Sequence, residues 1–200
     1  MNNSIALFQK YLPEPAVSYC YDLWQAHHFT FKITKPRRSK LGDYCHRPGQ
    51  GHHITVNQNL NPYSFLITYL HEVAHLLTFN QYKNRKIPHG KEWKKNFRDL
   101  LLPVMNEAVF PSAVLETLRA YSKNPLASTS SFVPLKEALH LYDPVDPAHL
   151  TLDQIALGEK FVLGKRIFVR GTLRRTRVLC IETSTGRQYT VSIKALVKKC

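Results

Sequence analysis

Three histidines and one glutamate in "HEVAHLLTFNQYKNRKIPHG", residues 71–90, have the types and spacing of a metal site. His71 and His75 are four residues apart, so on an α-helix they project from one face, one turn apart. Two imidazoles placed in this way can both reach one zinc ion at bond lengths of about 2.0–2.1 Å. Glu72 points slightly aside, where a carboxylate can take a proton from water instead of binding the ion. The HExxH pattern therefore predicts a zinc centre that activates water.

The third ligand must lie farther along the chain, because a catalytic zinc site uses three protein ligands and leaves one position open. The segment after HEVAH lacks the glycine and histidine of the metzincin pattern, and Glu92 and Glu107 are candidates of the thermolysin type. His89 is the better candidate, since it lies between a proline and a glycine where the chain can turn back. The alternative is a helix with ordinary surface histidines, but chance placement predicts only about 0.02 HExxH matches in this chain.

The elements around this motif follow from hydrophobic periodicity. Asn61 and Pro62 predict the start of a helix over residues 62–80 that carries HExxH on its surface. Strands are predicted at 29–34 and 52–57, with a loop between them that allows a short strand near Tyr44. Helices are predicted at 4–28, broken by two prolines, after His89, and at 111–124. Residues 125–150 are rich in Pro, Ser, Thr and His and indicate a connector.

The composition indicates a globular protein in a reducing compartment. Hydrophobic residues make up 44% of the 200 residues, and no stretch approaches the roughly 20 apolar residues of a membrane helix. The N-terminus lacks a basic region and a small-residue cleavage site, so no signal peptide is expected. The four cysteines form no CxxC pair, which argues against a cysteine-built zinc site and against a disulfide framework. A cytoplasmic location is expected.

The net charge of +14 predicts a polyanionic partner, with nucleic acid as the leading candidate. Residues 151–200 carry eleven Lys or Arg and three acidic residues, on short predicted strands separated by glycines and polar turns. The alternative is a solvated basic surface that serves only solubility.

The residues around the motif also resemble a known family. HEVAH, followed after thirteen residues by "HGKEWK", is similar to the SprT family of zinc metallopeptidase-like proteins, which includes the Spartan proteases. The resemblance extends upstream through "G.YCHRPGQGHHITVNQNLN" and covers roughly residues 5–105. It implies that His71, His75 and His89 bind Zn²⁺ and that Glu72 is the general base. Trp93 matches the family's aromatic one turn after the third ligand, and core packing is its expected role.

An edge strand in this type of domain pairs with an extended substrate, and the strand at 52–57 is expected to serve in this way. Its histidines, His52 and His53, are expected to face solvent or the cleft and not to bind the metal.

Together these features predict an α+β protein. A zincin-like metalloprotease domain is expected at 1–110, a helix and connector at 111–150, and a small basic β-hairpin domain at 151–200. This last domain takes the place of the family's zinc ribbon but lacks its cysteines. Phe168 and Tyr189 are candidates for base stacking, with core packing as the alternative. The residues expected to contact nucleic acid are Arg170, Arg174, Arg175, Arg177 and Arg187.

The resemblance implies a zinc metalloendopeptidase that acts near DNA, with DNA-bound or DNA-crosslinked proteins as candidate substrates. Single-stranded or damaged DNA is the expected partner, with the protein on the nucleoid when bound, no membrane association and no obligate protein partner. The alternative is a non-catalytic nucleic-acid-binding or regulatory protein with a structural zinc site. Glu72 favours the enzyme, because a purely structural site does not need a carboxylate there.

Overall fold

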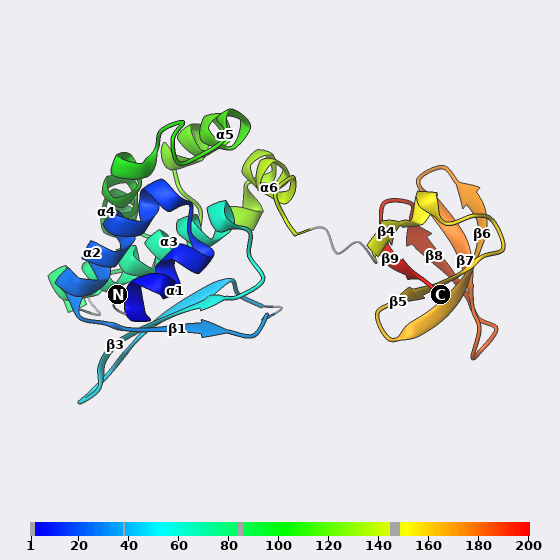
Figure 1. The fold of residues 1–200 in the computed structure, drawn as a ribbon, viewed down its shortest axis with the longest axis horizontal. Coiled ribbons are helices and arrows are strands. Elements are labelled where there is room, and N and C mark those ends of the chain that lie inside the picture. Colours follow the sequence, from blue (N-terminus) through cyan, green and yellow to red (C-terminus); the bar gives the residue numbers. More distant parts are fainter. Residues whose placement is uncertain (1–2, 38, 84–85, 145–148) are drawn as a thin grey trace. The chain divides into compact units, whose positions relative to one another are not determined.

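The computed structural model describes residues 3–37, 39–83, 86–144 and 149–200 (Figure 1). The chain divides into two compact units, Met1–Pro144 and Val145–Cys200. Each unit has a hydrophobic core of its own. The units are therefore described separately.

The described part of the first unit contains six α-helices and a three-stranded sheet. The N-terminal helical region consists of two helices separated at Pro13 and Pro15, and the strands predicted at 29–34 and 52–57 are confirmed. The elements are α1 (Asn3–Tyr11), α2 (Val17–His27), β1 (Thr30–Thr34), β2 (Gly42–Arg47), β3 (Gly51–Asn57), α3 (Pro62–Tyr82), α4 (Lys91–Leu101), α5 (Ser112–Ser122) and α6 (Val133–His140).

Strand order corrects one prediction. The sheet runs β1-β3-β2, with β1 parallel to β3 and β2 antiparallel to it. The strand at 52–57 is therefore central, because it has hydrogen-bonded neighbours on both sides. The edge strand that lies over α3 is β2, in a stretch where only a short strand near Tyr44 was predicted.

Helix α3 is the central element of the first unit. The Asn61 side chain caps it by accepting a hydrogen bond from the Ser64 backbone N–H at 2.9 Å, and Pro62 occupies its first turn. Apolar side chains such as Leu66, Leu70 and Val73 are fully buried along it. This burial, more than helix propensity, holds the helix in place.

Residues 111–144 do more than connect two domains. Helix α6 lies in the predicted connector and contributes Leu135 and Leu139 to the same core as α3. The Asn61 side chain donates hydrogen bonds to the Leu139 carbonyl at 3.0 Å and to the Asp143 carboxylate at 2.6 Å. The end of α6 is thus tied to the N-cap of α3.

The second unit is a six-stranded antiparallel sheet in the order β4-β9-β5-β6-β7-β8. Its core includes Phe161, which stacks on Phe168 with ring centroids 5.7 Å apart. The sheet is larger than the predicted set of hairpins. The strands are β4 (His149–Thr151), β5 (Lys160–Leu163), β6 (Arg166–Arg174), β7 (Arg177–Glu182), β8 (Gln188–Ser192) and β9 (Leu196–Lys199).

Among the described helices of both units, none has the length and apolar character required to cross a bilayer.

Candidate metal centre and active site

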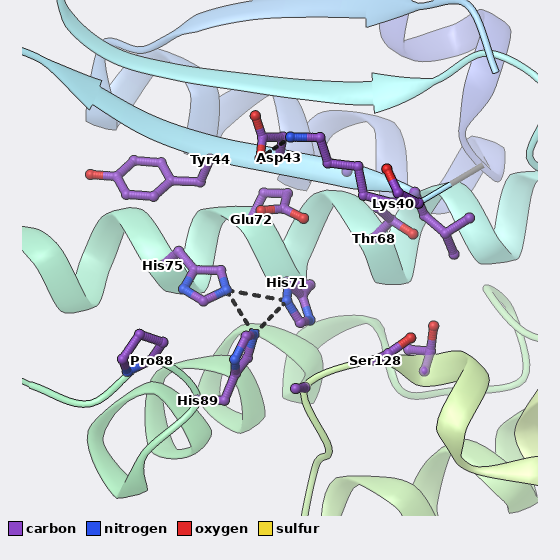
Figure 2. Close-up of a pocket in the computed structure, with 15 residues that line it drawn as sticks. Lys40, Asp43, Tyr44, Thr68, His71, Glu72, His75, Pro88, His89 and Ser128 are labelled. Atoms are coloured by element: carbon purple, nitrogen blue, oxygen red, sulfur yellow. Dashed lines mark hydrogen bonds and ion pairs between the residues drawn. The ribbon is translucent and has the colours of Figure 1, made fainter. Parts of the chain in front are cut away.

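Three imidazoles converge in one cleft of the first unit. His71 and His75 lie one turn apart on α3, and His89 comes from the turn before α4. Their Nε2 atoms form a nearly equilateral triangle with sides of 3.0, 3.1 and 3.2 Å (Figure 2). Within the described ranges, no other group of three His, Cys, Asp or Glu residues brings its ligand atoms this close together. The structure therefore brings the three predicted ligands together.

The triangle fits a metal ion with three nitrogen ligands. Around a tetrahedral ion with bonds of about 2.0–2.1 Å, ligand atoms are separated by about 3.3 Å, which is close to the spacing of these Nε2 atoms. Burial, together with the neighbouring His75 and His89, lowers the pKa of His71 to about 3, and burial together with His89 lowers that of His75 to about 4. Burial also lowers the pKa of His89. All three rings are thus neutral at pH 7, which is the form that binds metals.

A strained turn positions His89. Its φ of 59° lies in the left-handed region, which is uncommon for a residue with a side chain. The Gly90 N–H donates a hydrogen bond to the Ile87 carbonyl at 3.0 Å, and a Cβ at position 90 would lie 2.9 Å from that oxygen. The glycine after His89 therefore allows the turn to close and the imidazole to face α3.

Glu72 lies beside the triad on the side of strand β2 (Figure 2). Its side chain is buried, and the Tyr44 backbone N–H donates a hydrogen bond to the carboxylate. Burial and, to a lesser extent, the nearby charge of Asp43 raise the pKa of Glu72 to about 8, although Arg37 and Lys40 oppose this rise. A carboxyl group with a pKa near neutrality can both accept and release a proton.

Gly42 provides the space that the Glu72 carboxylate occupies. A Cβ at this position would lie 2.5 Å from Glu72 Oε1 and 2.7 Å from Thr68 Cγ2. Any larger residue would have to displace one of these side chains. Gly42 is the first residue of β2, so strand placement and carboxylate placement are coupled.

Aromatic side chains pack around the imidazoles. Trp93 is 1% exposed, and its ring lies 4.6 Å from that of His71 and 4.7 Å from that of His89, centroid to centroid. It therefore packs behind the triad and does not line the cleft. On the other side, the Tyr44 ring lies parallel to His75 and its hydroxyl is 3.0 Å from His52 Nδ1.

The cleft has a volume of about 450 Å³ and two walls. Residues 39–44, which lead into and form the start of β2, make one wall, and an ion pair of 2.8 Å joins Lys40 to Asp43 there. Residues 127–129, between α5 and α6, also line the cleft, and Figure 2 shows Ser128 on the side away from Glu72. Amino acids more than 80 positions apart thus enclose one site.

The five arginines predicted to contact nucleic acid do not form one cluster. Arg174, Arg175 and Arg177 lie at the turn between β6 and β7, and we call them the hairpin-turn arginines. Arg187 lies at the opposite end of β7, beside the turn into β8. Arg170 is half-buried and pairs across the sheet with buried Cys180.

The two aromatics proposed for base stacking are packed inside the second unit. Phe168 is 3% exposed and belongs to the core, which rules out stacking on a base in this structure. Tyr189 is half-buried against Phe168, with ring centroids 5.6 Å apart, and Arg166 lies over its ring.

Several cleft residues were not predicted from the sequence. Gly42 and Tyr44 lie in a stretch that resembles the family, and the Gly-Asp-Tyr sequence that begins β2 was the available signal. Residues 127–129 carried no signal, because small polar side chains in a connector do not reveal that they face a site.

Comparison with protein-family models matches residues 16–108 to the SprT-like family. A search of curated proteins gives no match, and no solved structure matches the chain. The matched range contains β1–β3, α3 and α4, and with them the three histidines and Glu72. The cleft wall at 127–129 lies outside that range. Residues 16–108 are therefore similar to the SprT-like family.

Proposed function

We propose that this protein is a zinc-dependent metalloendopeptidase that acts near DNA, on proteins bound or crosslinked to it. The observation that carries the proposal is the Glu72 carboxylate, buried in a cleft beside three converging neutral imidazoles. The similarity to the SprT-like family supports it, because that family suggests a metallopeptidase-type hydrolase.

His71, His75 and His89 would hold the zinc ion through Nε2. When bound, zinc supplies a Lewis acid that polarises a peptide carbonyl and acidifies water. Glu72 accepts a proton from water at its carboxylate and then delivers it to the amide nitrogen of the leaving peptide. Gly42 and the Tyr44 N–H hold that carboxylate in place.

The edge strand β2 is the proposed site for the substrate backbone. Among the described strands it pairs with β3 on one side and has no partner on the other, and Gly42, Asp43 and Tyr44 line the cleft. An extended peptide can add to such an edge through main-chain hydrogen bonds, which select for extended conformation more than for side chains. Residues 127–129 would confine the peptide on the other side.

The hairpin-turn arginines are the proposed contact with DNA in the second unit. All three are exposed at one end of a sheet whose unit has few acidic residues. Contacts of this kind bind phosphate without reading sequence. They would bring DNA-bound proteins to the enzyme, and selectivity would come from this recruitment.

A non-catalytic nucleic-acid-binding or regulatory protein with a structural zinc site is the second candidate. Structural zinc sites are usually closed by four protein ligands. Here three ligand groups converge within the described residues, and a carboxyl stands beside them in an open cleft. This arrangement favours the enzyme.

The test is cleavage of a basic DNA-binding protein by the zinc-loaded full-length chain, with and without DNA. Cleavage that depends on DNA is the expected result. Cleavage at the same rate without DNA would retain the peptidase and remove the recruitment. Zinc and DNA binding without any cleavage would establish the non-catalytic alternative.

A further inference from the structure

In the sequence of the first unit, positive charge is concentrated in residues 30–57, a range in which Lys32 and Arg47 lie on strands. Residues 30–57, which include β1, β2 and β3, contain six Lys or Arg and one acidic residue, Asp43. Residues 1–144 as a whole contain seventeen Lys or Arg and ten acidic residues, a net charge of +7. The sheet region supplies +5 of this. The rest of the first unit, which includes its helices, therefore contributes only +2 of its net positive charge.

The described helices of the first unit cover only one face of its sheet (Figure 1). Phe31, Ile33, Ile54 and Val56 point into the core, and Figure 1 shows the helices of the first unit on one side of the sheet. Because side chains alternate along a strand, their neighbours point the other way. We call this second surface the open sheet face, and it consists of Thr30, Lys32, Thr34, Asp43, Cys45, Arg47, His53, Thr55 and Asn57.

The cations here are not neutralised by neighbouring carboxylates. Lys32, Lys35 and Arg47 are exposed, and none of them makes an ion pair with a described residue. Arg37 bonds to the neutral side chains of Asn57 and Thr55, at 2.8 and 3.1 Å. The only nearby acid on these strands is already paired with Lys40.

The open sheet face contains no Phe, Tyr or Trp, so it offers no platform on which unpaired bases could stack. It offers instead cations, threonine hydroxyls and a flat backbone. These groups suit phosphate oxygens, and duplex DNA presents phosphates at the higher linear charge density.

We propose that the open sheet face binds the phosphate backbone of duplex DNA. Lys32 and Arg47 lie on the two outer strands, offset by four residues, so their Cα atoms are about 16 Å apart, a span of about five phosphates on one strand. The inner side of β2 lines the cleft, so DNA on this face would lie one sheet thickness from the metal site. The inference rests on the proposed action near DNA but does not require peptidase activity.

The test measures the salt dependence of DNA binding by the full-length zinc-loaded chain. A short fluorescein-labelled duplex is titrated at NaCl concentrations of about 50 to 200 mM, and binding is followed by anisotropy. Lys32→Gln with Arg47→Gln removes two charges from the open sheet face. Lys123→Gln with Lys136→Gln removes two exposed charges near α5 and α6 and is the matched control. Arg174→Gln, Arg175→Gln and Arg177→Gln together test the hairpin-turn arginines.

The open-face pair is expected to reduce the slope of log K against log[salt] by about 1.8, because each phosphate contact contributes about 0.9. The control pair should change it by less than about 0.5. Equal effects of the two pairs would overturn the inference, since net charge alone would explain them. Loss of binding only in the arginine triple variant would also overturn it, while leaving the proposed function intact.

Binding by the wild type, and by a second variant of the same region, distinguishes the remaining outcomes. A wild-type chain that binds single-stranded DNA but not the duplex would remove this inference and leave the proposed function intact, whereas a chain that binds neither would remove both this inference and the DNA component of the proposed function. Lys35→Gln with Arg47→Gln is a second variant of the same region, expected to lower the slope to the same extent. Zinc content equal to that of the wild type shows that each variant has folded.

Discussion

Glu72 depends on two neighbours that have no catalytic group of their own. Gly42 leaves the space that its carboxylate fills, and the Tyr44 backbone N–H donates a hydrogen bond to it. Both neighbours belong to β2. The position of the proposed general base is thus set by how closely the edge strand approaches α3.

Gly42→Ala tests this dependence. The added methyl group would meet Glu72 Oε1 and Thr68, so the carboxylate must move. Displacement of a catalytic group by about 1 Å can cost on the order of 100-fold in rate, and we expect kcat to fall by about 10- to 100-fold with zinc still bound. Steady-state cleavage and zinc analysis on the same sample measure both quantities.

A double variant provides the control for Gly42→Ala. If the substitution acts through Glu72, it should have little further effect in the Glu72→Gln background. If Gly42→Ala instead lowers the residual rate of Glu72→Gln by the same factor as it lowers the wild-type rate, Gly42 acts on something other than the carboxylate.

The metal-free protein should lose stability as the pH rises from about 6.5 to 8. The pKa of Glu72 is about 8 in the folded state against 4.5 unperturbed, so the folded state retains a proton that the unfolded chain has released. Stabilisation from this group is therefore complete below 4.5 and is lost as the pH rises through about 8. The contribution of Glu72 to stability is expected to fall by roughly 1–2 kcal/mol from pH 6.5 to 8, and this fall, measured as the difference between the wild type and Glu72→Gln, is abolished in the variant.

The histidines act in the opposite direction at lower pH. His71 and His75 have pKa values of about 3 and 4 when folded, against 6.5 unperturbed, so protons taken up by the unfolded chain destabilise the fold below pH 6.5. Urea unfolding in EDTA at several pH values separates the two effects. A slope above pH 6.5 that is identical in Glu72→Gln would contradict the assignment.

At the level of elements, the cleft is completed by a segment outside the matched range. Residues 127–129 lie between α5 and α6, and α6 is tied to the start of α3 through Asn61. The α5–α6 region is therefore part of the site's framework. Its small side chains leave the cleft open on that side.

Ala127→Trp should narrow the cleft. Ala127 is exposed and lines it, so an indole at this position would occupy space meant for substrate. We expect kcat/KM for a protein substrate to fall by about tenfold or more, with zinc affinity unchanged, because the ligands are not touched. Ala108→Trp, at an exposed site outside the cleft lining, is the matched control. Equal losses in both variants would show that residues 127–129 do not confine the substrate.

The local sequence pattern predicted the elements that carry the ligands. Contacts between residues far apart in the sequence could not be predicted and became known only from the structure. The apolar spacing of α3 and the cap at Asn61 predicted the helix, and the i, i+4 spacing predicted that His71 and His75 share a face. Strand order was predicted incorrectly, because nothing within the strand at 52–57 shows that it has two neighbours. The role of Gly42 was missed for the same reason, since it depends on contact with a helix 30 positions away.

At the level of the whole molecule, zinc should stabilise only one of the two units. Each unit has its own core, and all three proposed ligands lie in the first. Calorimetry should therefore show two unfolding transitions. Zinc should raise the midpoint temperature of the first unit's transition and leave that of the second unit unchanged. At a free zinc concentration of about 100 Kd the stabilisation is about 2.7 kcal/mol.

His71→Ala is the control for this measurement. It removes one ligand, so zinc should no longer shift the first transition. A zinc-dependent shift of the second unit, or a shift that survives His71→Ala, would place the metal elsewhere in the chain.

The most direct test of the central claim compares three zinc-loaded chains at equal protein concentration: wild type, Glu72→Gln and Glu107→Gln. The last removes the same charge at an exposed position outside the cleft lining. One zinc ion per chain is expected in all three. Cleavage of an unstructured protein should be unchanged in Glu107→Gln and at least about 100-fold slower in Glu72→Gln, because the proton acceptor is gone. Cleavage by Glu72→Gln at the wild-type rate would contradict the account.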